Sequence, residues 1–257
     1  MKMIVKTSHL LLILIFSGNL FAAEESKNQV PSGLDARVWE QEIILSEAHR
    51  LAEKGFYDQA IEKYRESLAP RFIKSEIDKS GFYDGVLRVY RLQGKFREAF
   101  NELQWFMKIN PKGDGWVDDK LQLEALIKAG DMRSNQPVHD YIKYLREKYK
   151  NMLPPVSYDG NYAPIVVSKI IFCYSRIGNA DGGIAFMDEI INYFASGKVG
   201  KRAEERAFTT RNPYFVIRQA FEQDKKEGFK GCLDAKPGEA CMGRATKALI
   251  QSDYFPW

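Results

Sequence analysis

The feature that most constrains this chain is a glycine that recurs at the end of stretches with helical apolar spacing. Such glycines stand at positions 55, 94, 130 and 178, at intervals of 39, 36 and 48 residues. Apolar side chains around them return every three or four residues, which is the period of an amphipathic helix. No segment shows the sustained alternation of a half-buried strand. The pattern therefore predicts an almost entirely α-helical chain built of helix–turn–helix hairpins.

The hairpin around Gly94 has the clearest pattern. Gly94 permits a tight turn between two helices, and the small Ala99 lets the second helix approach the first. Large side chains at helical spacing are expected to fill the space between hairpins, whereas Trp105 is off this spacing and is expected at the surface. The full set of matching positions is Tyr83, Val86, Leu87, Tyr90, Gly94, Phe96, Ala99, Phe100, Leu103, Phe106 and Pro111.

This spacing resembles the tetratricopeptide repeat. A hairpin ending in residues 55–68 and another over residues 167–190 share the pattern. The hairpin between them is degenerate, because Asn135 occupies the small-residue position and the second helix restarts at Pro137. The likeness therefore covers the chain unevenly, with the hairpin around Gly94 as its best copy.

The resemblance implies an all-α fold in which a right-handed α-α superhelix extends over residues 35–198. Residues 199–257 do not repeat the pattern and are expected to form a C-terminal helical cap, because terminal repeats need an atypical outer face. Within this cap, helices are expected at about 214–227 and 239–251. In the family, the first helix of each repeat lines a concave groove that binds peptides, so the resemblance also implies a non-catalytic scaffold for a protein or peptide partner.

Groove positions carried over from the family give the candidate partner-binding residues. Most of them are basic, and arginine in such a groove pairs with carboxylates in two-pronged geometry. The alternative is that these are solvated charges on exposed helix faces, which are common in helical proteins. Some members of the family bind a peptide's C-terminal carboxylate through asparagines at fixed groove positions. Those asparagines are absent here, so binding of a C-terminal carboxylate is not expected. The candidates are His49, Arg88, Arg91, Lys120, Lys128, Phe172 and Arg176.

Residues 1–22 have the order of a secretory signal peptide. A basic start is followed by an apolar run from Leu10 to Phe16 and by small residues that end at Ala22. The apolar run is too short for a membrane span, which needs roughly 20 residues. Cleavage is therefore predicted after Ala22, leaving a flexible lead over residues 23–34. The mature chain is expected in the periplasm, with no stable membrane span.

Three cysteines remain in the mature chain. Cys232 and Cys241 flank a loop of eight residues, and in an oxidising compartment a disulfide is expected to close it. The alternatives are two free thiols or a catalytic redox pair, although such pairs normally have two intervening residues. Cys173 lies in an apolar helical stretch and is expected to be a buried small hydrophobic residue.

Charge and hydropathy exclude two broad classes of protein. The chain carries 38 Lys and Arg against 34 Asp and Glu, and removal of the signal peptide, with Lys2 and Lys6, leaves 36 − 34 = +2. A nucleic-acid-binding protein is usually more basic than this, so no nucleic-acid partner is expected. A mean hydropathy of −0.38 excludes a protein with many membrane spans.

Signs of catalytic chemistry are weak. His49 and His139 have no neighbours at metal-ligand spacing, and no phosphate-binding loop or nucleophile motif is present, so no metal or cofactor is expected. The acidic residues Asp114, Asp118 and Asp119 are explained by the start of a helix. Two alternatives to the scaffold remain: an inhibitor or immunity-type protein that occludes a toxin or wall-cleaving enzyme, and a wall-cleaving enzyme on a helical-repeat scaffold.

Overall fold

The computed structural model describes residues 36–67, 69, 72, 79–109, 116–150, 162–195, 213–235 and 241–252. Within these ranges the regular structure is α-helical apart from a single 3₁₀ residue, which confirms the predicted all-α class. The predicted signal peptide and flexible lead lie outside the described residues. The helices are α2 (Ala36–Glu53), α3 (Tyr57–Glu66), α4 (Lys79–Leu92), α5 (Phe96–Ile109), α6 (Trp116–Met132), α7 (Gln136–Lys148), α8 (Tyr162–Arg176), α9 (Ala180–Ala195), α11 (Pro213–Lys226) and α12 (Arg244–Ile250).

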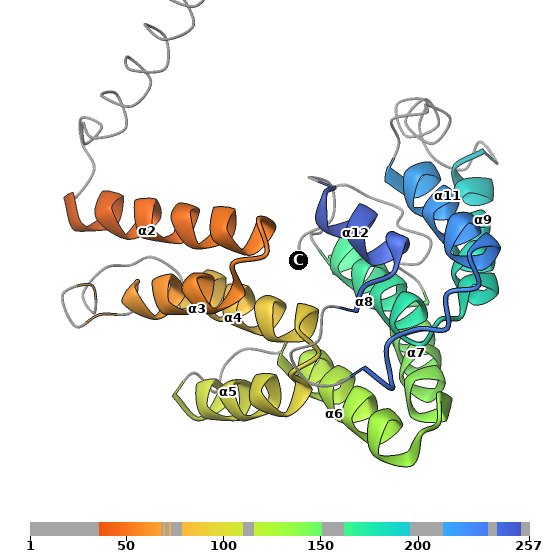
Figure 1. Ribbon diagram of the computed structural model, residues 1–257, viewed down its shortest axis with the longest axis horizontal. Helices are drawn as coiled ribbons and strands as arrows, with labels where there is room; N and C mark the ends of the chain where they lie inside the picture. The colour runs from red at the N-terminus through yellow and green to blue at the C-terminus, as the bar shows by residue number, and fades with distance from the viewer. Residues whose placement is uncertain are drawn as a thin grey trace, which may run out of the picture.

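Helices that follow one another in the chain pack against one another from α2 to α9. Figure 1 shows this succession, in which each helix turns back on the one before it. The handedness of a superhelix stays a prediction. The tight connections follow from the sequence: Gly55, Gly94 and Gly178 each adopt a positive φ, of 80°, 69° and 66°, which glycine tolerates without strain. The backbone amide after each glycine then donates to the carbonyl five residues back.

The third connection departs from the expected position. Gly130 lies inside α6, and the left-handed residue of this turn is Arg133, with a φ of 48°. The amide of Ser134 still donates to the carbonyl of Ala129, so the same helix-ending geometry forms without glycine. The predicted restart at Pro137 is confirmed, because α7 has a proline in its first turn.

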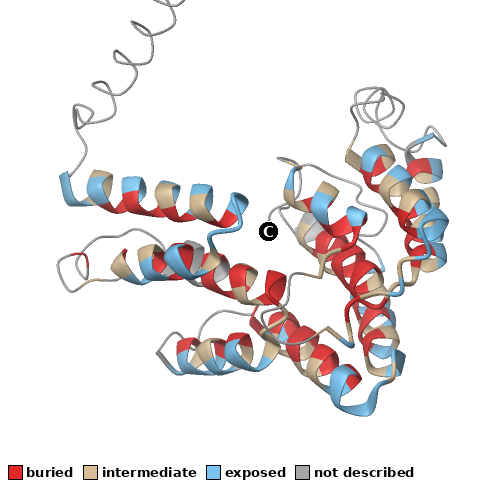
Figure 2. Cartoon of the chain, viewed as in Figure 1, coloured by how far each residue is buried: buried red, intermediate tan, exposed pale blue. Residues whose placement is uncertain are grey.

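Two clusters of buried apolar side chains form the interior of the described chain. The N-terminal core joins α2, α3, α4 and α5 to the first half of α6, as far as Leu123. The C-terminal core begins at Ala125 on the same helix and continues through α7, α8, α9, α11 and α12. Figure 2 shows the buried faces of α6 and α8 turned toward neighbouring helices. Because α6 contributes to both cores, it joins the two halves of the molecule.

The C-terminal region covers part of the fold instead of only extending it. Helix α11 packs on α9, and α12 packs on both α11 and α8 (Figure 1). The last helix begins at Arg244, later than the expected 239, because residues 241–243 are not helical. Both oxygens of the Asp224 carboxylate accept hydrogen bonds from the first amides of α12, those of Arg244 at 2.8 Å and Ala245 at 3.1 Å.

We call residues 229–235 and 241–252 the C-terminal strap. The predicted disulfide is confirmed within it: Cys232 and Cys241 are bonded, with Cα atoms 5.6 Å apart. The strap meets the end of α8 through close backbone contact, since a Cβ atom added to Gly178 would lie 2.2 Å from the carbonyl carbon of Lys230. The amide of Cys232 also donates to the carbonyl of Arg176, at 2.8 Å.

Candidate partner-binding surface and buried charge network

Two of the predicted groove residues meet near the end of α2. The Tyr64 hydroxyl is hydrogen-bonded to Nδ1 of the exposed His49 at 2.7 Å, and the two rings meet edge to face. Arg88, half-buried on α4, acts electrostatically on both of them and on Tyr57. We call His49, Glu53, Tyr57, Tyr64 and Arg88 the α2–α4 cluster. It brings a guanidinium, an imidazole and two phenols from three helices into one electrostatic neighbourhood.

Burial controls the ionisation of the α2–α4 cluster. It lowers the pKa of His49, and the positive charge of Arg88 lowers that pKa further, so the imidazole is neutral around pH 7. Burial also lowers the pKa of Arg88, while Tyr64 and Glu53 act in the opposite direction. The cluster therefore combines the positive charge of Arg88 and the negative charge of Glu53 with an imidazole and two phenols, groups that form hydrogen bonds without a charge.

The two lysines predicted for the groove lie on α6. Lys120 is half-buried and its Nζ is 3.9 Å from the Glu124 carboxylate, one helical turn along. Lys128 is exposed two turns further along the helix. An ion pair of this kind, four residues apart on a helix, contributes only about 0.3–0.5 kcal/mol to stability. Lys120 and Lys128 thus remain accessible to a partner.

Arg91 is placed inside the protein and not on the exposed face that a groove residue needs. Only 8% of its surface is exposed, and its guanidinium donates to Oδ1 of Asp119 at the start of α6. The same carboxylate oxygen accepts a hydrogen bond from Nζ of Lys169 on α8, at 2.8 Å. Asp119 therefore links three helices, each the first helix of its hairpin.

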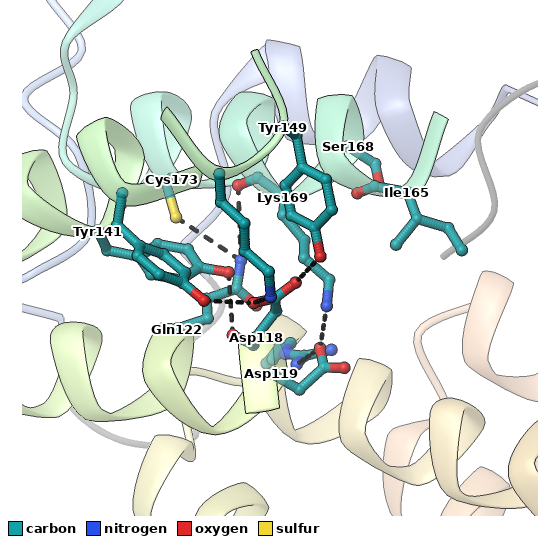
Figure 3. A network of polar contacts seen from close by, with 12 residues as sticks. Asp118, Asp119, Gln122, Tyr141, Tyr149, Ile165, Ser168, Lys169 and Cys173 are labelled. Atoms are coloured by element: carbon teal, nitrogen blue, oxygen red, sulfur yellow. Dashed lines mark hydrogen bonds and ion pairs between the residues drawn. The ribbon is translucent and has the colours of Figure 1, made fainter. Parts of the chain in front are cut away.

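Asp118 forms the second half of this buried network, which Figure 3 shows from close by. Its Oδ1 accepts hydrogen bonds from Nζ of Lys148 at 2.8 Å and from the Tyr144 hydroxyl at 3.1 Å. Its Oδ2 accepts one from the hydroxyl of Tyr149, and its backbone carbonyl accepts one from Tyr141. Asp118 thus ties the start of α6 to the far end of α7. We call the groups around Asp118 and Asp119 the seam, because α6 lies between the two cores.

In the seam, each aspartate carboxylate is paired with at least one cation. Burial alone would raise the pKa of Asp119 and is the largest single influence, but Lys169 and Arg91 together outweigh it and hold that pKa below its usual value. Next to this site, the amide of Gln122 approaches the sulfur of Cys173 at 3.6 Å. Cys173 is buried as predicted, and burial raises the pKa of its thiol to about 12.

The seam was missed by sequence reasoning, which explained Asp118 and Asp119 by helix-end electrostatics alone. Asp114, the third residue of that acidic run, lies outside the described residues. The two aspartates do begin α6, but their cationic partners lie 28 to 50 residues away in the chain. The sequence did contain a signal for this network: two adjacent acids flanked by apolar helical positions. Acids at such positions are rarely buried without cationic partners, so the pair indicates a buried ion-pair site.

The groove candidates on α8 are covered by the protein itself. Phe172 is 3% exposed and Arg176 is 5% exposed. The neighbouring Ser175 hydroxyl accepts a hydrogen bond from Thr246 of α12, at 2.8 Å. The structure thus leaves the α2–α4 cluster and the α6 lysines accessible, whereas Arg91 is in the seam, Phe172 is in the core and Arg176 lies beneath the strap.

The outer side of α7 carries an open hollow of about 400 Å³. It is lined mostly by one face of α7, together with Tyr174 of α8. Arg146 on its rim is paired with Glu189 and lies over the Phe186 ring, so positive and negative charges alternate there. The lining residues are His139, Ile142, Lys143, Arg146, Glu147 and Tyr174.

The described residues hold no group of three histidine, cysteine or acidic side chains arranged to bind a metal ion. Among the described helices, none is both long and apolar enough to traverse a bilayer. Comparison of the chain with protein-family models, with curated proteins and with solved structures returned no match in any of the three.

Proposed function

We propose that this chain is a non-catalytic scaffold of tetratricopeptide-like hairpins that binds a protein or peptide partner. The observation that carries the proposal is the α2–α4 cluster. It offers a partner the exposed His49 and the half-buried Arg88 on successive first helices. Arginine in a partly desolvated position is well suited to pair with carboxylate or carbonyl groups of a peptide, because its planar guanidinium presents several fixed donors.

The accessible charges on α6 support a surface that continues beyond this cluster. Lys120 and Lys128 stand two turns apart, and the ion pair that Lys120 makes among the described residues is a long contact to Glu124. The positive groups of α4 and α6 would attract an acidic segment over a distance comparable to the Debye length, about 8–10 Å in physiological salt. The partner class proposed is therefore an acidic protein segment, with electrostatic attraction setting its approach.

We propose the periplasm as the working compartment. The Cys232–Cys241 disulfide is compatible with an oxidising space, where such bonds form and persist. The predicted signal peptide at residues 1–22 points to the same destination. In this setting the scaffold would act in envelope assembly or secretion, as the tetratricopeptide resemblance implies.

The test is affinity capture of envelope proteins on the mature chain, with variants that change the cluster but keep its size. Arg88→Gln removes the charge, and His49→Gln keeps a hydrogen-bonding group opposite Tyr64. The matched control is Arg65→Gln, which breaks an exposed ion pair between α3 and α5. We expect the Arg88 and His49 variants to lose a partner that the Arg65 control retains.

The proposal fails if both cluster variants recover the same proteins as the wild type. Circular dichroism of each variant separates loss of binding from loss of folding. Salt dependence gives a further check, because binding that rests on Arg88 and the α6 lysines weakens as ionic strength rises.

A further inference from the structure

Arg176 is a buried cation without a carboxylate partner among the described residues. It lies at the end of α8, and its Nη1 donates one hydrogen bond, to the carbonyl of Cys241 at 2.9 Å. Its guanidinium carbon lies 5.0 Å from the centre of the Phe96 ring. Its Nε is buried and makes no hydrogen bond to a described residue. Burial lowers the pKa of Arg176 to about 10, and no charge among the described residues offsets this.

The guanidinium of Arg176 has fewer hydrogen-bond acceptors among the described residues than a buried charge usually has. A guanidinium has five N–H donors, and burying it costs free energy unless anions or several acceptors replace water. The carbonyl of Cys241 is neutral and accepts one hydrogen bond, whereas a carboxylate accepts two parallel N–H groups of a guanidinium and also neutralises its charge. The site therefore favours an anion over the acceptor that now occupies it.

The acceptor belongs to the strap, whose helix α12 is bonded to Asp224 of α11 and to Glu227 just after it. Its polar contacts with α8 are fewer within the described residues. The strap meets α8 through the Cys241 carbonyl, the Cys232 amide and the hydroxyl of Thr246. Helix α12 has only seven residues, and isolated helices of that length are unstable in water. Displacement of the strap would uncover Arg176 together with Ser175, which is a donor beside a cation on one helix.

We propose that Arg176 anchors a carboxylate-binding site beneath the C-terminal strap, and that the Cys241 carbonyl holds the place of a partner's carboxylate. A carboxylate fits because its two oxygens match two parallel N–H groups of a guanidinium. The inference rests on the proposed function for its ligand, a carboxylate of a bound peptide. The strap and the partner then compete for the same arginine.

The experiment measures carboxylate binding to the purified mature protein by NMR. Sodium acetate is added at constant ionic strength, with sodium chloride as the control salt, and the Arg176 Nε–H signal and the strap amides are followed. We expect a saturable shift with acetate and none with chloride. Arg176→Gln should abolish the response of the strap amides, whereas the matched control Arg65→Gln should keep it.

If the strap keeps acetate from reaching Arg176 in the wild-type protein, a second variant is needed to test acetate binding. Replacing both Cys232 and Cys241 with serine loosens the strap, so the fraction of molecules able to bind increases and the apparent affinity for acetate rises with it. The proposal is overturned if neither the disulfide-bonded protein nor this variant shows an acetate-specific shift. It is equally overturned if Arg176→Gln responds as the wild type does.

Further probes identify the source of the carboxylate. A capped peptide containing glutamate tests side-chain carboxylates, its glutamine analogue is the neutral control, and a peptide with a free C-terminus tests the terminal carboxylate. The outcome is separable from that of the partner-capture test. Acetate binding that depends on Arg176 would stand even if the Arg88 variant captured every partner, and loss of capture through Arg88 would stand if acetate did not bind.

Discussion

Two buried arginines, Arg91 and Arg176, lie in regions of the molecule that differ in the partners they give a positive charge. In the seam, Arg91 donates to Asp119, which also pairs with Lys169, so cations and carboxylate are buried together. Beneath the strap, Arg176 has one neutral carbonyl and an aromatic face. Arg91 is 8% exposed and Arg176 is 5% exposed, so exposure alone does not show whether a buried cation has a charged partner.

The difference follows from what each region joins. The seam lies where α6 passes from one core to the other, and its pairs span α4, α6, α7 and α8. Removing Arg91 leaves Asp119 buried with one cation in place of two. The strap, in contrast, covers one face of α8 and holds Arg176 through a neutral carbonyl. A network of carboxylates paired with cations suits a permanent junction between helices. A buried cation bonded to a neutral carbonyl suits a contact that another acceptor can replace.

The largest expected effect separates the two arginines directly. Arg91→Met leaves Asp119 in the interior with Lys169 as its remaining cation, and removing one partner of a buried pair costs up to about 3–5 kcal/mol of stability. Arg176→Met leaves only a carbonyl without its donor, which costs at most about 1–3 kcal/mol. Urea unfolding followed by circular dichroism measures both. Equal losses in the two variants would remove the distinction between the regions.

The second effect is the pH dependence that the seam imposes. The pKa of Asp119 is lowered below its usual 3.8 in the folded protein, so the unfolded chain takes up this proton first as the pH falls. Its stabilising contribution is complete above the usual pKa and is lost as the pH falls through the folded value. Asp119→Asn should flatten the dependence of the unfolding free energy on pH below about pH 4. An unchanged slope would exclude Asp119 as its source.

The third effect concerns the strap. Replacing Cys232 and Cys241 with serine opens a loop with a sequence separation of 9 residues and should cost roughly 2–3 kcal/mol. Hydrogen exchange should accelerate in strap amides such as that of Cys232, while amides of α6 keep their relative protection. Faster exchange of both regions together would show that the strap and the seam unfold as one unit.

The smallest effect tests how α12 is held. Asp224→Ala removes the carboxylate that accepts hydrogen bonds from the first two amides of α12, and loss of such a cap costs about 0.5–2 kcal/mol. Asp224→Asn is the matched control, because it retains one acceptor oxygen. Thermal unfolding of both variants measures the difference. Identical midpoints would mean that α12 is held by packing alone.

Local patterns in the sequence anticipated much of the fold. The apolar periodicity predicted the hairpins, Trp105 is 50% exposed as expected, and Cys173 is buried. Gly130 was the exception, because α6 continues to Met132 and the helix-ending geometry forms at Arg133 instead. Each of these expectations uses residues within a few turns of one another.

The candidate site was predicted less completely. His49 and Arg88 do come together, but Arg91 turns into the seam and Arg176 lies beneath the strap. Helical spacing assigns a residue to a face of its own helix, whereas its exposure depends on which distant segment covers that face. Thr246, for example, reaches Ser175 across 71 residues of chain.

The sequence by itself determined the helices, the glycine turns and the cysteine pair, because each depends on local backbone preference or on a short loop. The tertiary structure alone decided which charges are buried and with what partners. Asp119 meets a guanidinium and an ammonium from two other helices, while Arg176 meets a carbonyl. The physical reason is that the energy of a buried charge is set by groups far apart in the chain, whose meeting is a result of packing.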